Sequence, residues 1–241
     1  MKKLLVWGSL ALAVAGQAVA DEIFKENVHP VTPLAISLAS PLQLPGPDWR
    51  VWGLRFDGFY GRSKELYGLD AGIVARTDGD FWGIGVSGFN SVNDNMSGIH
   101  AGVVANVVHG DVAGVQLGGV LNRDLGAVAG VQGALINYDG VLYGVQFGLL
   151  DWNNGISYGW QTAVANVNVN EFTGASFGLV NMTNRMGGFQ LGLVNLVDEE
   201  GSGLQVGLFN GAVKFEGVQI GLLNVIQTSE LPIMALVNAN F

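Results

Sequence analysis

The polar side chains that could do chemistry recur at one place in a short repeat. If the first glycine of each repeat is position 0, position +2 carries Arg55, Asp70 and His100 in three of the first four units. Asp57 stands at position +4 of the first unit, where glycine is usual. If neighbouring strands place equal positions side by side, these residues cluster on the lumen face of a closed sheet. We interpret the cluster as a polar constriction or a small binding patch; the alternative is a satisfied ion pair that pins the first strands to the segment before them.

Glutamine occupies position +2 in most later repeats, and asparagine is frequent at position +7. The units are not phosphate loops, because no Gly-Lys-Ser/Thr sequence occurs and each glycine lies within a strand pattern. Asparagine at +7 is typical of a strand end, since it tolerates left-handed backbone and bonds its own main chain. We therefore assign a structural role to the glutamines. They include Gln116, Gln132, Gln146, Gln190, Gln205 and Gln219.

The sequence offers no catalytic or metal-binding set. The chain has no cysteine, which excludes disulfides, thiolate zinc sites and thiol nucleophiles. Its three histidines, His29, His100 and His109, are scattered, and no serine lies in a G-x-S-x-G turn. A net charge of −9 disfavours nucleic acid, because phosphate binding needs a basic surface. We expect neither an enzyme nor a cofactor, and the sequence does not identify a ligand.

The repeat fills residues 51–241 as a single domain. Position 0 recurs every 14 to 16 residues, and Val, Leu, Ile or Phe dominate positions +1, +3 and +5. This period of two predicts a β-strand with a small polar face and an aliphatic face. Short turn-like segments separate the strands, and a degenerate unit at Leu231 brings the total to about thirteen. The position-0 glycines are Gly53, Gly68, Gly83, Gly98, Gly114, Gly130, Gly144, Gly159, Gly174, Gly188, Gly203 and Gly217.

The first fifty residues differ from the repeat. Residues 1–20 carry two lysines, an apolar run and an Ala-x-Ala site, which predicts a secretory signal peptide. Residues 21–50 form a lead-in with five of the six prolines. Its alternating Ile36, Leu38 and Leu42 indicate one further strand before a Pro-Gly-Pro turn.

Two architectures repeat a strand and a turn. An unbroken strand of about eleven residues spans about 35 Å, whereas four turn residues reach at most about 14 Å. Such a turn cannot carry the chain back to begin a parallel coil, so unbroken strands predict an antiparallel up-and-down meander. We expect an all-β transmembrane β-barrel of about 12–14 short-looped strands. The alternative is a β-solenoid with about 15 residues per coil, which requires each strand to bend at position 0.

Composition and the C-terminus favour a membrane location. Only 13% of residues are charged and the mean hydropathy is +0.36, whereas soluble domains carry about 25% charged residues. The chain ends in Phe241 after alternating apolar residues, which resembles the assembly signal of outer-membrane barrels. The expected partners are outer-membrane lipid and the barrel assembly machinery. We expect export to the outer membrane of a Gram-negative bacterium, with the periplasm or secretion as alternatives.

Units such as "GFQLGLVN", "GLQVGLFN" and "GVQIGLLN" resemble bacterial surface-repeat proteins built on Gly-x-Gln-x-Gly-x-x-Asn. The lead-in "PLQLPGPDWRVWGLRFDGFYG" resembles their N-terminal segment, so the resemblance covers residues 33–241. It implies an exported protein of the cell surface or outer membrane, without a known catalytic activity or an agreed ligand.

Together these features predict an outer-membrane β-barrel surface protein, structural or weakly permeable, without catalysis. The alternative is a secreted or periplasmic β-solenoid that acts as an interaction or adhesion surface.

Overall fold

The computed structural model describes residues 29–241, all of whose regular structure is β-strand. The predicted signal peptide lies outside these residues. The strands are β1 (Val31–Ala39), β2 (Leu42–Leu44), β3 (Arg50–Ser63), β4 (Glu65–Thr77), β5 (Phe81–Val92), β6 (Met96–Val108), β7 (Val112–Gly118), β8 (Leu121–Gly133), β9 (Ile136–Phe147), β10 (Leu150–Asn153), β11 (Ser157–Thr162), β12 (Ala165–Phe177), β13 (Val180–Leu191), β14 (Val194–Val206), β15 (Phe209–Ile226) and β16 (Ile233–Asn240).

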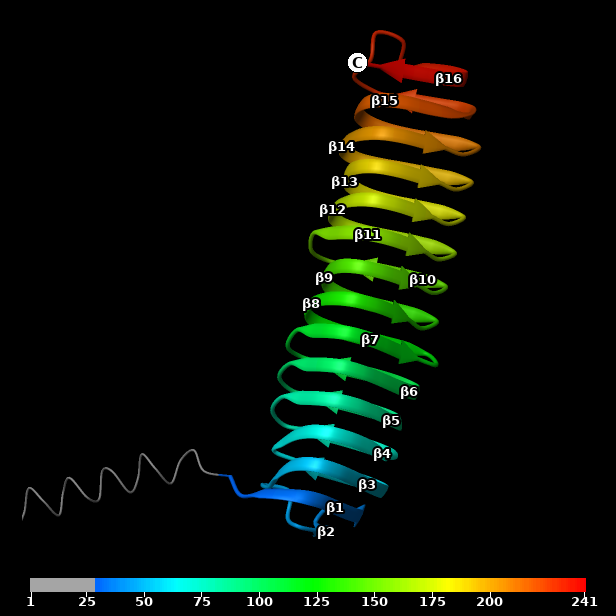
Figure 1. The fold of residues 1–241 in the computed structure, drawn as a ribbon. Coiled ribbons are helices and arrows are strands. Elements are labelled where there is room, and N and C mark those ends of the chain that lie inside the picture. Colours follow the sequence, from blue (N-terminus) through cyan, green and yellow to red (C-terminus); the bar gives the residue numbers. More distant parts are fainter. Residues whose placement is uncertain (1–28) are drawn as a thin grey trace, which may run out of the picture.

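The strands stack in parallel into a single rod (Figure 1). All pairings from β3 to β15 are parallel, and repeat positions align, so that Gln132 of β8 lies beside Gln146 of β9. An up-and-down barrel needs antiparallel neighbours. The predicted transmembrane barrel is therefore wrong, and the fold is the alternative, a β-solenoid with about 15 residues per coil.

The chain does not form the predicted meander because its strands do not run straight. In all twelve repeats the position-0 glycine has a φ between 117° and 153°, which side-chain-bearing residues rarely adopt. A Cβ added to Gly130 would lie 1.9 Å from the carbonyl oxygen of Gly114 in the preceding coil. Glycine at this position therefore permits both the unusual backbone and the close stacking of consecutive coils. The chain itself turns back at other positions, as at Gly148 and Leu149 between β9 and β10.

Each coil has two faces joined at two edges, and the coil around β10 and β11 shows all four. Strand β11 belongs to the long face, which holds positions −2 to +3, and β10 belongs to the short face, which holds positions +6 to +9. The chain passes from the long face to the short face at Gly148 and Leu149. It returns at residues 154–156, between β10 and β11. In several other coils a continuous strand runs around one of these edges.

Side chains from both faces fill the space between them. Position −2 contributes an apolar row that includes Leu66, Phe81, Met96, Val128 and Leu142. Beside it on the long face lie the glutamines of position +2, and the short face contributes the asparagines near position +7. The interior members of both sets are at most 3% exposed. The described coils therefore enclose packed side chains, and the weakly permeable lumen expected of a barrel has no counterpart in them.

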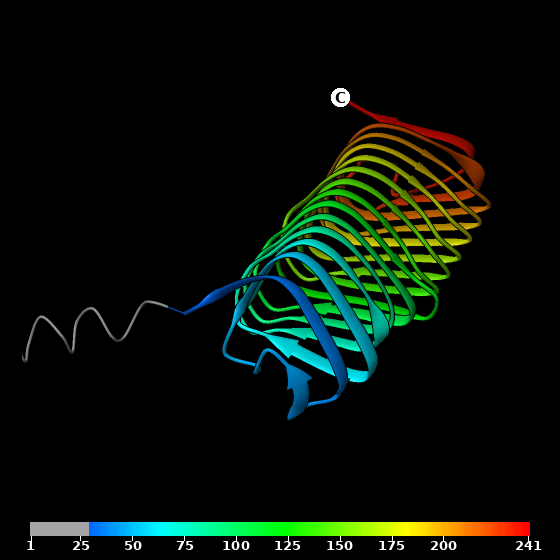
Figure 2. The same cartoon turned by 60° about the horizontal axis from the view of Figure 1, so that its bottom comes forward.

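The two ends of the rod are built differently from its body (Figure 2). The strand expected in the lead-in is present in two pieces: β1 pairs in parallel with β3, and β2 folds back antiparallel on β1. At the other end β16 pairs antiparallel with β15. Phe241 follows β16 and is 95% exposed; the assembly role expected for it presupposed a barrel.

Candidate functional site

The first polar cluster is an ion-pair network sealed inside the N-terminal coils. Arg55 donates from Nε to Asp70 Oδ1 at 2.8 Å and from Nη2 to Asp70 Oδ2 at 2.5 Å. Its Nη1 donates to Ser63 Oγ at 2.6 Å, and Asp57 Oδ2 lies 3.2 Å from Arg55 Nε. All four residues are at most 5% exposed. The structure thus brings together three of the four predicted residues.

The electrostatics of this cluster are set by burial and by the attraction between Arg55 and the two carboxyl groups. Burial opposes the charge on Arg55, but Asp70 and Asp57 outweigh it and raise the pKa of the guanidinium. Burial raises the pKa of Asp57 to about 7, with Arg55 acting in the opposite direction. Because the bidentate Arg55–Asp70 pair is buried, it is an ion pair rather than an accessible binding patch. Its hydrogen bonds join β3 to β4 rather than to the segment before them.

His100 lies in the interior two coils further along and takes part in no ion pair with this cluster. Neither ring nitrogen has a hydrogen-bond partner, and the ring packs on Phe81 with centroids 4.1 Å apart. A Cβ on Gly85, in the intervening coil, would come within 2.7 Å of the His100 ring. Burial, followed by the charge of Arg55, lowers the pKa of His100 to about 3. The side chain is therefore a neutral filler of the space that Gly85 leaves.

The asparagines near position +7 form two ladders along the rod. Asn90, Asn106, Asn122 and Asn137 each donate from Nδ2 to the side-chain oxygen of the next coil, at 2.7–3.0 Å. A second ladder runs from Asn166 to Asn224 at 2.7–2.8 Å. Most members also donate to a backbone carbonyl near the edge between the long and short faces, as Asn195 does to Val206 at 2.9 Å. The asparagines therefore hold coil to coil, a role that strand-end turn chemistry did not predict.

Asp151 interrupts the ladder between its two halves. It accepts from Asn137 Nδ2 at 2.7 Å and lies beside Asn166 in the next coil. Asp151 Oδ2 and Asn166 Oδ1 both lack a hydrogen-bond donor. Burial raises the pKa of Asp151 to about 7. A protonated Asp151 would supply the missing donor, so neutral carboxylic acid is the form that fits this position.

A second row of buried acids and amides lies in β8 and β9. Gln132 Nε2 donates to Asp124 Oδ2, and Gln146 Nε2 donates to Asp139 Oδ2. Burial raises the pKa of Asp124 to about 7, and burial together with the charge of Asp124 raises that of Asp139 well above its usual value. The two carboxyls lie in adjacent coils and are fully buried. They favour neutral or proton-sharing forms rather than a pair of charges.

The polar groups of the interior are therefore not accessible to solutes. The described residues contain no group of three His, Cys, Asp or Glu side chains placed to hold a metal ion. Sequence reasoning missed Asp124, Asp139 and Asp151 as interior residues. The sequence did hold a signal for Asp124 and Asp139. Both stand near position +9, where other repeats carry buried apolar residues such as Val108 and Val197.

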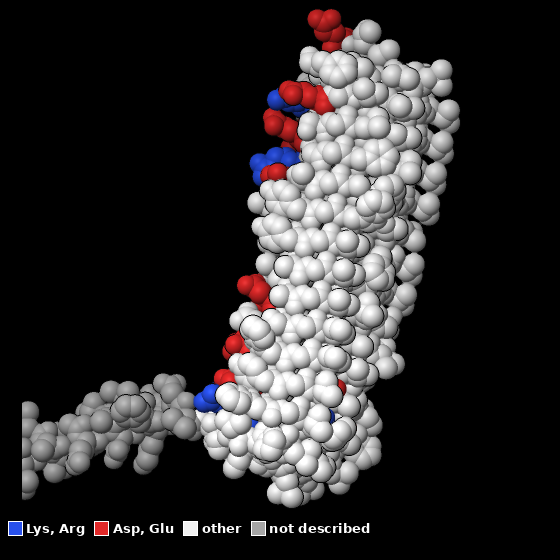
Figure 3. Space-filling model, viewed as in Figure 1, with Lys and Arg blue, Asp and Glu red and all other residues white. Residues whose placement is uncertain are grey.

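The outer surface is divided lengthwise by charge. One edge, between the short face and the next long face, carries most of the exposed charged residues, and Figure 3 shows them gathered along one side of the rod. We call it the charged edge; its residues include Asp78, Asp80, Asp94, Asp111, Glu171, Arg185, Glu200 and Lys214. Some of these charges pair with each other, as Lys214 does with Glu200 at 3.3 Å.

The opposite edge, between the long and short faces, is aliphatic. It presents one exposed branched side chain in ten of the twelve repeats, each between 46% and 74% exposed. We call it the aliphatic edge. Its residues are Ile73, Val103, Val120, Leu135, Leu149, Val164, Leu179, Leu193, Leu208 and Leu222.

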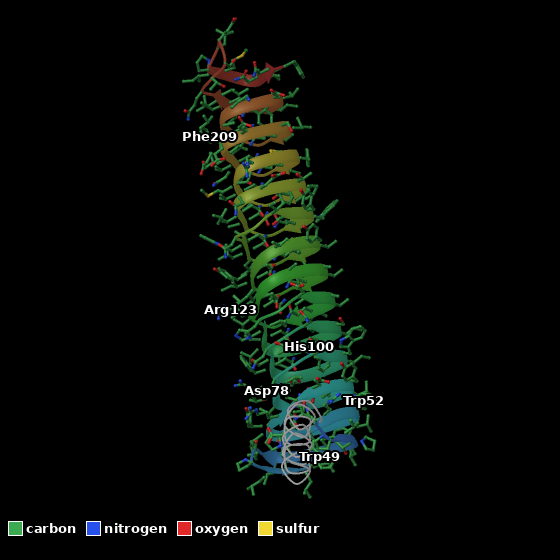
Figure 4. All side chains as sticks on the ribbon, turned by 90° about the vertical axis from the view of Figure 1, so that its left-hand side faces the viewer. Trp49, Trp52, Asp78, His100, Arg123 and Phe209 are labelled. Carbon is green, nitrogen blue, oxygen red and sulfur yellow. The ribbon has the colours of Figure 1, made fainter. Side chains whose placement is uncertain are left out.

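Apolar side chains also cover the outsides of both faces. In Figure 4, which looks onto the charged edge, Trp52 of the long face and Phe209 of the short face project to opposite sides. Position −1 of the long face is aromatic in five of the twelve repeats, and these residues form the aromatic row. Trp52, Tyr67 and Trp82 contact one another in consecutive coils, and Tyr143 stacks on Tyr158 with centroids 5.5 Å apart.

Comparisons with known proteins do not indicate a function for this chain. No protein-family model, curated protein or solved structure matches the chain. The resemblance to bacterial surface-repeat proteins therefore stays a prediction. Within residues 29–241 there is no helix long and apolar enough to cross a membrane.

Proposed function

We propose that the chain is an exported, non-catalytic β-solenoid whose aliphatic edge and adjoining faces form an interaction surface. One observation carries the proposal: exposed charge gathers along one edge, while the opposite edge exposes an aliphatic side chain in nearly every coil. Apolar patches of more than a few hundred Å² on a soluble protein mark interaction sites. Export rests on the N-terminal sequence pattern of residues 1–20.

The interior supports a structural role for the polar residues. The glutamine, asparagine and aspartate side chains hydrogen-bond mainly to one another or to backbone groups, and they are buried. A catalytic group must reach its substrate within hydrogen-bond distance. The exposed apolar surface is therefore the part of the described coils through which the molecule meets a partner.

A pair of matched variants tests this function. The edge variant combines Leu149→Lys, Leu179→Lys and Leu193→Lys on the aliphatic edge. The control variant adds the same three charges at the charged edge, through Asn170→Lys, Asn184→Lys and Gln227→Lys. Circular dichroism should show the same β signal for both, because the edge leucines are about half exposed.

Retention on an octyl support at constant salt measures the apolar surface directly. We expect the wild type and the control variant to be retained and the edge variant to elute markedly earlier, because three lysines interrupt the aliphatic row. Equal retention of the edge variant and the wild type would show that the aliphatic edge is not the interaction surface.

A further inference from the structure

We propose that the partner of this surface is one leaflet of a lipid bilayer, with the aliphatic edge among the acyl chains and the charged edge in water. The inference rests on the proposed function, because it names the occupant of the same surface. It differs from the barrel prediction in that the rod lies along the membrane and enters a single leaflet.

The order of side chains across the long face matches the order of layers in a leaflet. Next to the charged edge comes the aromatic row, represented by Tyr158 at 40% exposure. Trp160 follows at position +1, and Val164 lies at the aliphatic edge. Charged groups prefer water, tyrosine and tryptophan prefer the interface, and aliphatic residues prefer the acyl region. The long face arranges all three in this order in the coils of Tyr67, Tyr143 and Tyr158.

The width of the long face also fits a leaflet. Six residues separate the aromatic row at position −1 from the aliphatic edge at position +5. At roughly 3.3 Å per residue this distance is at most about 20 Å. A bilayer of about 40–45 Å, including the headgroups, gives about 20–22 Å for each leaflet. The aromatic row can therefore lie at the headgroups while the aliphatic edge reaches the middle of the bilayer.

The backbone amides of the aliphatic edge are hydrogen-bonded, which suits them to an apolar environment. An unpaired peptide group in hydrocarbon costs several kcal/mol, but the edge amides bond from coil to coil. Leu149 N donates to Leu135 O at 2.9 Å, and Leu179 N donates to Val164 O at 3.0 Å. Leu193 and Leu208 repeat the same bond at 2.9 and 3.0 Å. These amides therefore need no water.

The shape of the apolar surface favours lipid over a second copy of the chain. In one coil the exposed apolar side chains include Phe147 on the long face, Leu149 at the edge and Trp152 on the short face. A flat partner against one face would leave the edge and the other face in water. Acyl chains can cover both faces and the edge together, so the lipid leaflet is the occupant that leaves the least apolar surface exposed.

Co-sedimentation with phosphatidylcholine vesicles tests the proposal on the full chain. All proteins keep the same residues 1–28, so any lipid binding by that segment is common to them. We expect the wild type and the control variant to sediment with vesicles and the edge variant to partition at least about tenfold more weakly, because lysine is strongly disfavoured in the acyl region. Bromine on the acyl chains should quench the tryptophan fluorescence of the wild type, and quench it less in the edge variant.

Two results would overturn the lipid assignment. One is a wild type that stays in the supernatant; the other is an edge variant that binds vesicles as well as the wild type does. If the wild type is held by the octyl support but not by vesicles, the interaction surface stands and lipid is the wrong partner. Sedimentation velocity without vesicles would then show whether a second copy covers the surface, through dimers that the edge variant does not form.

Discussion

Asp151 shows how a single atom can interrupt an otherwise regular ladder. An asparagine here would accept from Asn137 and donate to Asn166, as the ladder members on either side do. The aspartate leaves two facing oxygens without a donor unless it is protonated. The free energy of unfolding of the protein therefore depends on pH through Asp151.

We predict that Asp151→Asn stabilises the protein at neutral pH. The pKa of Asp151 is raised to about 7 in the folded chain, against about 3.9 for an unperturbed aspartate. The wild type therefore loses stability as pH rises from about 4 to about 7, because the unfolded chain releases its proton first. The gain at pH 8 should be on the order of 2–4 kcal/mol, with little difference near pH 4. Urea unfolding at the two pH values measures it.

The matched control is Asp198→Asn at the charged edge, where the carboxylate is exposed and a change within about 0.5 kcal/mol is expected at either pH. A loss of stability on Asp151→Asn at pH 8 would contradict the assignment of a neutral, donating carboxyl to this position.

At the scale of one coil, the position-0 glycine decides the architecture. We predict that Gly130→Ala prevents proper stacking of β8 on β7, because the new Cβ would lie 1.9 Å from the Gly114 carbonyl oxygen and φ is +149°. Thermal unfolding should report a destabilisation above about 4 kcal/mol, or failure to fold.

The contrasting substitution is Gly46→Ala in the lead-in. A Cβ at this position meets nothing within 4 Å, so the midpoint of unfolding should hardly move. A Gly130→Ala protein as stable as the Gly46→Ala protein would show that stacking does not depend on glycine at position 0.

The same glycines explain what the sequence could and could not predict. The period of two correctly predicted strands with a small polar face and an aliphatic face, and the spacing correctly predicted a repeat of about 15 residues. The architecture was missed because spacing alone does not reveal the φ of Gly130 or the turn at Gly148, on which the choice between barrel and solenoid depends.

The candidate cluster was predicted in part for a similar reason. Parallel stacking in register places equal repeat positions side by side, so Arg55 lies beside Asp70 in the solenoid. The sealing of Arg55, the isolation of His100 and the buried Asp124–Asp139 pair depend on how the short face closes over the long face. No local pattern in the sequence encodes the separation between the two faces.

At the scale of the molecule, the rod is a stack in which each coil contacts mainly its neighbours, so coils are removable units. We predict that deleting residues 180–193 leaves a folded protein, because Val180 and Val194 hold equivalent positions in consecutive coils. The rod should shorten by about 4.8 Å. The β signal per residue in circular dichroism should stay unchanged, and small-angle scattering should show the shorter length.

Deleting only residues 187–193 provides the comparison. This half-coil deletion joins position −2 directly to position +6 and destroys the alignment of the glutamine and asparagine ladders. We expect an unfolded or aggregated product. Equal folding of both deletions would contradict the repeat unit assigned here.

The reversed direction of β16 affects how readily one molecule can stack end to end on another. A stack of identical parallel coils would offer at its last strand the same edge that each coil offers the next, which is the situation that lets amyloid fibrils grow without limit. Strand β16 instead runs antiparallel, shifts register against β15 and places Leu236 at a φ of 69°. Its residues also lack the glycine and glutamine of the repeat. The edge that β16 presents therefore differs from the edges between coils, which disfavours the addition of further coils end to end.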